Sequence, residues 1–107
     1  MRIVVKKVCQ LPEVREIKGT LENLKDIVGG YIECFPMFEN ILCVCNEDGK
    51  LIGLPVNFLY KSDVIVGDVF FCSGGEEDFE SLNDKQVDLI MQLMTAIENV
   101  RQLKRQN

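Results

Sequence analysis

The chain has 107 residues, of which 47% are hydrophobic and 27% are charged, and its formal net charge is −5. This composition fits one globular domain over residues 1–107 with a single hydrophobic core, and it excludes a largely disordered chain. No apolar run approaches the roughly 20 residues of a membrane span, and the negative charge argues against general binding to nucleic acid.

The cysteines and the first residues indicate a protein of a reducing cytoplasm. Residues 1–7 lack the long apolar core of a secretion signal. The cysteine number is odd, and we expect all five thiols to be buried in strands and reduced. They are Cys9, Cys34, Cys43, Cys45 and Cys72. Because the chain has no histidine and its closest cysteines are a single C-x-C pair, the sequence predicts no zinc site.

The first third of the chain predicts a strand followed by a short helix. A β-rich run over residues 3–9 ends at Leu11–Pro12, and residues 14–17 form a loosely extended segment. Thr20 is the expected N-cap of the helix, and Gly29–Gly30 provides its end. The apolar residues that share one face of this helix are Leu21, Leu24, Ile27 and Val28.

The middle of the chain predicts strands. Residues 31–35 form one strand, and residues 41–45 form a second. Asn46–Gly49 has the composition of a hairpin turn, so we expect residues 50–57 to return as the partner of the second strand. Residues 64–72 are the most hydrophobic run and predict one further strand.

A long helix is predicted from about Leu82 to about Lys104, with Ser81 as its N-cap and Asp84 completing a variant of the capping box. The order β-α-β-β-β-β-α predicts an α+β fold with a single mixed or mainly antiparallel sheet of about five strands. Residues 1–80 would hold the sheet and the short helix, and residues 81–105 the C-terminal helix. We expect the helices to cover one face of the sheet, and the first helix could make a right-handed crossover between the first two strands.

The C-terminal helix has an apolar stripe that is wider than one contact with a sheet requires. A 3-4-3 spacing typical of a coiled-coil seam links Ile90, Leu93, Ile97 and Val100. These residues predict a homo-oligomer formed through this helix. The alternative is one broad surface that faces the chain's own core.

The sequence shows no catalytic apparatus. Without histidine, the Ser-His-Asp and Cys-His arrangements are excluded, and the glycine pairs do not match a phosphate-binding loop. Carboxylates occur at Asp63, at Asp68 and in the acidic run over residues 76–80, and we expect them to be solvated. We therefore predict a non-enzymatic protein with no cofactor and no metal.

Polar residues within apolar strands are the best candidates for a binding site. A carboxylate or amide near a core must be paired or solvated, and tyrosine offers both a ring and a hydroxyl. A ligand cleft could be built from Tyr31, Glu33, Asn57 and Tyr60. The alternative is that these residues are outward-facing strand positions and turn caps.

Several blocks of the chain resemble a small family of unknown function that occurs in bacteriophages, plasmids and integrated elements of Gram-positive bacteria. Residues 20–33, which read TLENLKDIVGGYIE, resemble its signature. So do NEDGKL with GLPVN at 46–57, DVIVGDVFF at 63–71 and EDFESL at 77–82. The long final helix departs from the short tails of that family. The resemblance implies a setting and no activity.

Three functions follow from these observations. The first is an accessory protein of a phage or mobile element that binds and modulates a host component, such as a defence protein. The second is a binding protein that sequesters a small nucleotide signal. The third is a structural or assembly role.

Overall fold

The computed structural model describes residues 1–75 and 78–105. It confirms the α+β class, with antiparallel strands, a short helix and a long C-terminal helix. In chain order the elements are β1 (Arg2–Lys6), β2 (Glu13–Glu16), α1 (Leu21–Val28), β3 (Ile32–Pro36), β4 (Ile41–Asn46), β5 (Val56–Tyr60), β6 (Asp63–Val66), β7 (Val69–Gly74), β8 (Phe79–Glu80) and α2 (Asp84–Arg105).

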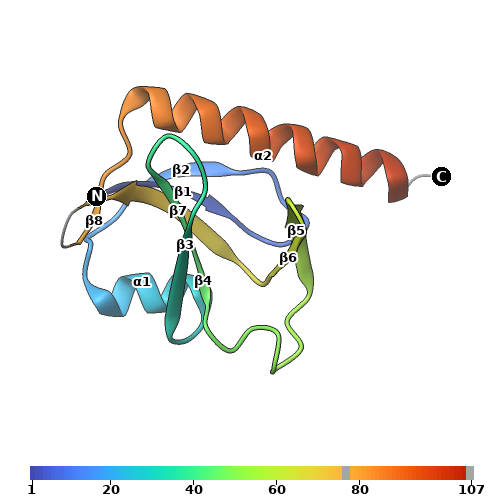
Figure 1. Cartoon of the computed structure of the whole chain (residues 1–107), viewed down its shortest axis with the longest axis horizontal. Coiled ribbons are helices and arrows are strands. Elements are labelled where there is room, and N and C mark those ends of the chain that lie inside the picture. Colours follow the sequence, from blue (N-terminus) through green and yellow to red (C-terminus); the bar gives the residue numbers. More distant parts are fainter. Residues whose placement is uncertain (76–77, 106–107) are drawn as a thin grey trace.

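The strands form two sheets. The larger sheet has six strands in the order β2-β1-β7-β4-β3, with β8 paired to one end of β7. The smaller sheet consists of β5 and β6. Every strand pair in the described part of the chain is antiparallel, so a crossover between parallel strands is absent there. Figure 1 shows α2 on one side of the large sheet and α1 on the other.

The central strand of the large sheet, β7, is apolar and is buried on both faces. Phe70 and Cys72 face a core cluster that includes Leu24 and Val28 of α1. Phe71 faces a second cluster, which contains Met94 of α2. The expectation that both helices cover one face is therefore wrong. The small sheet shares the α2 face, through the buried side chains of Phe58 and Ile65.

The short helix α1 follows its sequence signals closely. The Thr20 hydroxyl accepts a hydrogen bond from the backbone N–H of Asn23 at 3.2 Å, which confirms the predicted N-cap. Gly29 adopts the left-handed conformation (φ 78°) at the C-cap, as predicted.

The long helix α2 begins later than predicted and uses a different cap. The side chain of Asn83 accepts a hydrogen bond from the N–H of Gln86, whose side chain accepts one from the N–H of Asn83. This reciprocal pair is a capping box. Ser81 instead accepts a hydrogen bond from the N–H of Arg2, so Ser81 ties the chain before α2 to β1.

The middle of the chain differs most from its prediction. Residues 50–53 form turns, and the partners of β4 are β3 and β7, so the predicted hairpin of residues 41–45 with 50–57 is wrong. The predicted strand over residues 64–72 is divided between β6 and β7 at Gly67. Gly67 has a positive φ of 76°, which turns the chain from the small sheet into the large one.

All five cysteines are free thiols. Cys43 and Cys72 are buried as predicted, Cys9 and Cys45 are partly buried, and Cys34 is exposed because its strand β3 is an edge of the large sheet. Cys9 lies in a turn rather than in a strand. Among the described residues, no helix combines the length and the apolar character needed to cross a membrane.

We expect alkylation at neutral pH to distinguish these thiols. Iodoacetamide should modify Cys34 rapidly and leave Cys43 and Cys72 intact until the chain unfolds. Burial raises the pKa of Cys43 well above its ordinary value and that of Cys72 to about 12, so the reactive thiolate is scarce. Mass spectrometry of samples taken over time measures the order in which the thiols are alkylated. Equal rates at all three thiols without denaturant would contradict this fold.

Candidate functional site

A buried charged network joins β1, β5 and α2. The ammonium of Lys6 is fully buried, and its Nζ atom donates three hydrogen bonds. The acceptors are Oε1 of Glu98 at 2.9 Å, Oδ1 of Asn57 at 3.0 Å and the carbonyl oxygen of Lys7 at 2.8 Å. Three acceptors match the three donors of an ammonium group, so its loss of water is compensated within the fold.

The partners of Lys6 are satisfied as well. The side-chain amide of Asn57 donates to the carbonyl oxygens of Lys6 and Gly67, both at 2.8 Å. The second carboxylate oxygen of Glu98 accepts a hydrogen bond from Gln102 at 2.8 Å. In the described part of the chain, no buried side-chain nitrogen or oxygen lacks a partner. The network therefore braces the C-terminal half of α2 against the strands.

Glu98 is ionised in this environment. Burial alone would raise the pKa of Glu98, but hydrogen bonds from Lys6 and Gln102 and the positive charges of Lys6 and Arg101 outweigh it. The net result is a pKa below the ordinary value of 4.5. The charged carboxylate of Glu98 thus faces Lys6, and each of the two side chains is about 1% exposed or less.

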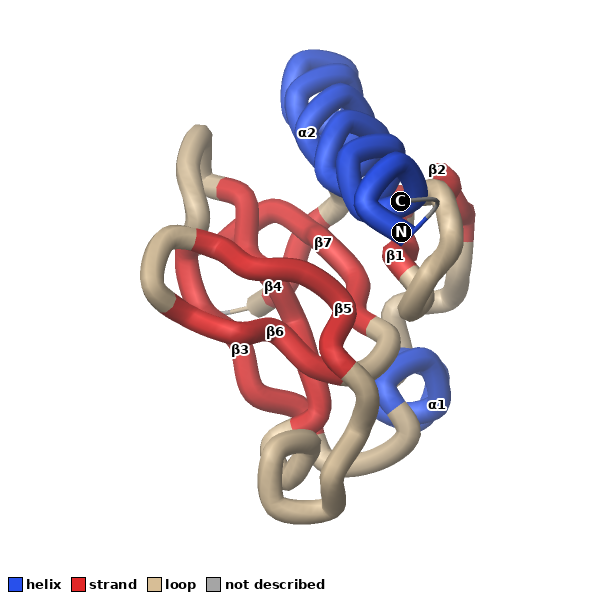
Figure 2. The backbone as a smooth tube through the Cα atoms, turned by 90° about the vertical axis from the view of Figure 1, so that its right-hand side faces the viewer, coloured by secondary structure: helices blue, strands red, loops and turns tan. Residues whose placement is uncertain are grey.

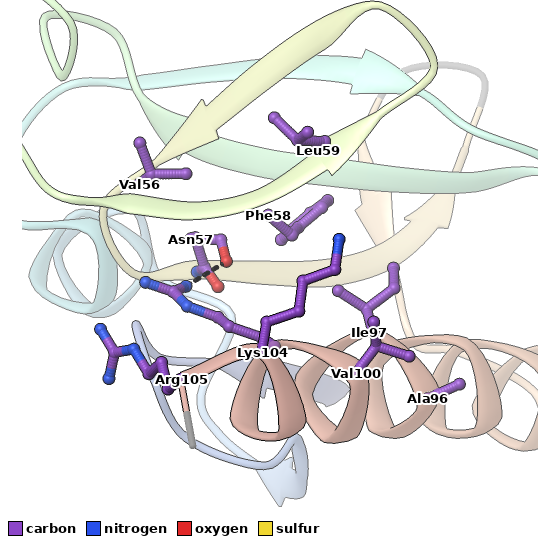
Figure 3. A pocket seen from close by; sticks show the side chains of 10 residues that line it. Val56, Asn57, Phe58, Leu59, Ala96, Ile97, Val100, Lys104 and Arg105 are labelled. Atoms are coloured by element: carbon purple, nitrogen blue, oxygen red, sulfur yellow. Dashed lines mark hydrogen bonds between the residues drawn. The ribbon is translucent and has the colours of Figure 1, made fainter. Parts of the chain in front are cut away.

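An apolar groove lies beside this network, between β5 and the C-terminal half of α2 (Figure 3). Its volume is about 580 Å³. The groove is lined by Val56, Asn57, Phe58 and Leu59 from β5, and by Ala96, Ile97, Val100, Arg101, Lys104 and Arg105 from α2. Figure 2 shows that β5 lies between β6 and α2, so the edge of β5 that is not bonded to β6 faces the helix.

The groove combines exposed aliphatic side chains with a basic end. Val56, Leu59 and Val100 are 45%, 65% and 51% exposed. Lys104 and Arg105 lie at the last turn of α2 and are exposed. These cations stand out because the chain as a whole carries a net charge of −5. A ligand with an apolar surface and an anionic group would match both parts of the groove.

Arg101 connects the groove to the network. One of its guanidinium nitrogens, Nη1, donates to the backbone carbonyl oxygen of Asn57 at 2.6 Å (Figure 3). Asn57 lies at a β-bulge, where the pairing of β5 with β6 shifts register. The bond therefore fixes the distance between β5 and α2 at one point along the groove.

The four residues of the predicted ligand cleft lie in different surroundings. Asn57 is buried in the network. Tyr31 is 65% exposed, with Nζ of Lys25 4.3 Å from the centre of its ring. Glu33 lines a separate, smaller hollow with Lys50, and the Tyr60 ring lies 6.3 Å from that of Phe35. Only Asn57 of the four reaches the groove, and its side-chain polar atoms bond within the chain.

The residues predicted for an oligomer interface are divided between the core and the surface. Ile90 is completely buried in the chain's own core, so it is not accessible to a second copy. Leu93 and Ile97 are partly buried and pack against that core. Val100 is exposed and lines the groove. Most of the stripe thus faces the chain's own core, as the alternative interpretation expected. Self-association stays a prediction.

Part of the other candidate chemistry meets in the smaller hollow, which is lined by Glu33, Cys45, Lys50 and Asp63 among others. Burial, followed by the charge of Glu33, raises the pKa of Cys45 to about 11, so this thiol is a weak nucleophile at neutral pH. Asp63 is paired with Lys50 at 2.8 Å on the surface, and Asp68 accepts a hydrogen bond from the N–H of Val8. Part of the acidic run, residues 76–77, lies outside the described residues. Within residues 1–75 and 78–105, no cluster of metal-binding side chains occurs.

Sequence reasoning missed Lys6 and Glu98, although both carry a signal. Lys6 is two residues after the buried Val4 on β1, so the two side chains point to the same face. Glu98 continues the four-residue spacing of Ile90 and Met94 on α2. A basic residue and an acidic residue each occupy a core position, and that combination predicts a buried ion pair.

We expect Glu98→Ala to destabilise the fold by about 3–5 kcal/mol, because it leaves the Lys6 ammonium buried without its counterion. The double variant Lys6→Met with Glu98→Leu should recover most of this loss, since it removes both charges. Chemical denaturation measures both values. Glu47→Ala, at an exposed position, is the control, and a Glu98→Ala effect within about 0.5 kcal/mol of the control would contradict the buried pair.

Stability should fall in acid because of the same carboxylate. The folded-state pKa of Glu98 lies below the unfolded-state value, so the unfolded chain takes up a proton first as the pH falls. The stability that Glu98 contributes is complete above about pH 4.5 and is lost as the pH falls through the folded-state pKa. Thermal unfolding of Glu98→Gln should show a weaker dependence on pH in this range than the parent chain.

Comparison with known proteins identifies the domain. Residues 1–95 match the family described as a domain of unknown function, DUF3846. Neither the curated proteins nor the solved structures gave a match. The matched region contains the eight strands found among the described residues and ends just before Ala96, the first residue of α2 that lines the groove. Since the match covers 95 of the 107 residues, this chain belongs to the DUF3846 family.

Proposed function

We propose that this chain is a non-enzymatic binding protein and that its binding surface is the groove between β5 and α2. The observation that supports this most directly is the basic end of an apolar groove on an acidic protein. Exposed aliphatic side chains give affinity through their burial, while Arg101, Lys104 and Arg105 select an anionic partner. The partner that fits is a protein with an acidic, partly apolar surface.

The setting belongs to the same proposal. The sequence blocks that resemble a family of phages, plasmids and integrated elements favour an accessory protein that acts on a component of its host cell. A binder with a small apolar groove can block a host protein, such as a defence factor, without any chemical step. The host component is therefore the partner that we propose.

A small nucleotide signal is the second candidate. The groove volume of about 580 Å³ lies in the range of small-molecule sites, and three cations could hold a phosphate. However, Phe58 is the aromatic residue of the lining and is only 3% exposed, so it offers little surface for a base to stack on. This favours the protein partner.

Affinity capture with matched variants tests the proposal. The tagged full chain and four variants are used as baits in lysate of a Gram-positive host. Val100→Glu and Lys104→Glu change the groove. Leu21→Glu and Lys18→Glu make the same kinds of change at exposed positions on and beside α1. We expect a host protein that the chain and the two controls retain and that the two groove variants lose.

The strength and the nature of this interaction give further readouts. Each groove variant should weaken the purified complex about tenfold, equivalent to about 1.4 kcal/mol, and added salt should weaken it further. Capture of the same proteins by all five baits would contradict a groove site. The second candidate would be favoured by a nucleotide that, at 100 times its dissociation constant, stabilises the parent chain by about 2.7 kcal/mol. The same nucleotide should leave the stability of the Lys104→Glu variant unchanged.

A further inference from the structure

We infer that the groove receives an acidic amphipathic helix of the partner, which lies along the C-terminal half of α2. This inference rests on the proposed binding function and specifies the structure of the partner segment. Three kinds of occupant could cover an apolar groove of this size: an added β-strand, a second copy of this chain, or a helix. The described residues decide between them.

An added strand is disfavoured although β5 has an edge that is not bonded to β6. The carbonyl oxygen of Asn57 faces α2 and already accepts the 2.6 Å hydrogen bond from Arg101. The β-bulge at this point also breaks the regular spacing of hydrogen-bonding groups that a new strand needs. A strand would have to displace Arg101 and bridge an irregular edge.

A second copy is disfavoured by charge. A symmetric dimer brings the same patch of both copies together. The groove lining of each copy contains the cations of Arg101, Lys104 and Arg105, so a dimer through it would bring six positive groups into one interface. The described lining residues include no carboxylate to compensate them.

A helix fits both the shape and the spacing of the groove. On α2, Ile97, Val100 and Lys104 follow each other at three and four residues, which is the spacing along which two helices pack. Val56 and Leu59 of β5 form the opposite apolar wall. Figure 3 shows Asn57 and Phe58 between β5 and α2, with Val56 and Leu59 beyond the ribbon of β5. A helix lying here would bury its apolar face between the two walls.

The charges set the sequence pattern of that helix. Apolar residues at positions i, i+3 or i+4, and i+7 would contact the two walls. Acidic residues near one end would meet Lys104 and Arg105, whose exposed side chains are free of the buried network. The partner segment is therefore an amphipathic helix with a carboxylate-rich end, and a basic amphipathic helix should be rejected.

Selection from a displayed library of random peptides tests this inference. The peptides are selected on the full chain and counter-selected on Val100→Glu. The enriched peptides should share the i, i+3 or i+4, i+7 apolar pattern with acidic residues toward one end. The best peptide should become helical on binding by circular dichroism, and a proline in its middle should abolish binding. Lys104→Glu should weaken binding about tenfold, and Lys18→Glu should leave it unchanged.

Several results would overturn the inference. One is enrichment of extended peptides with alternating apolar residues, whose binding slows hydrogen exchange along β5. Others are enrichment of basic peptides, or the absence of any binder sensitive to Val100→Glu. A dimer of the chain that Val100→Glu dissociates, measured by light scattering, would show that a second copy covers the groove. If capture from lysate still depends on the groove in these cases, the proposed function stands and only the helical partner fails.

Discussion

The buried pair of Lys6 and Glu98 is the interaction on which the rest of the structure depends. Both charges are removed from water, so their attraction and their hydrogen bonds must offset a large desolvation cost. The third member, Asn57, fixes β5 in the same network. Such a network tolerates little change in geometry, because any displacement leaves a buried charge without a partner. It therefore links α2, β1 and β5 through directional contacts at defined positions.

The groove is a consequence of this arrangement. On the C-terminal side of Met94, the buried residue of α2 is Glu98. The charged network, rather than a hydrophobic stripe, therefore holds this end of the helix near the small sheet. Exposed aliphatic side chains are left between the two walls, and the basic last turn closes one end. The helix wall of the groove lies beyond residue 95, where the family match stops. The β5 wall lies inside the matched residues and the α2 wall outside them, so a function based on the groove need not extend to the whole family.

Local signals in the sequence were sufficient for several elements. The Thr20 cap and the Gly29 end define α1 because both act on backbone groups within a few residues. The α+β class, the long C-terminal helix and the apolar character of β7 also follow from patterns in the sequence. The hairpin prediction failed because the turn at Asn46–Gly49 is real, but the chain after it continues through further turns before β5 begins. Turn chemistry fixes a reversal in direction, while strand pairing depends on which apolar faces meet.

The sequence by itself determined the two caps of α1, the apolar character of β7 and the absence of histidine chemistry, since these depend on residue type and short-range spacing. Only the tertiary structure decided which strands pair, that the two helices cover opposite faces, and that Lys6 meets Glu98 across 92 positions of the chain. It also decided that Val100 is exposed while Ile90 is buried, although both lie on one predicted seam. The physical reason is that contacts between distant residues depend on how whole faces pack, and no short-range pattern contains that information.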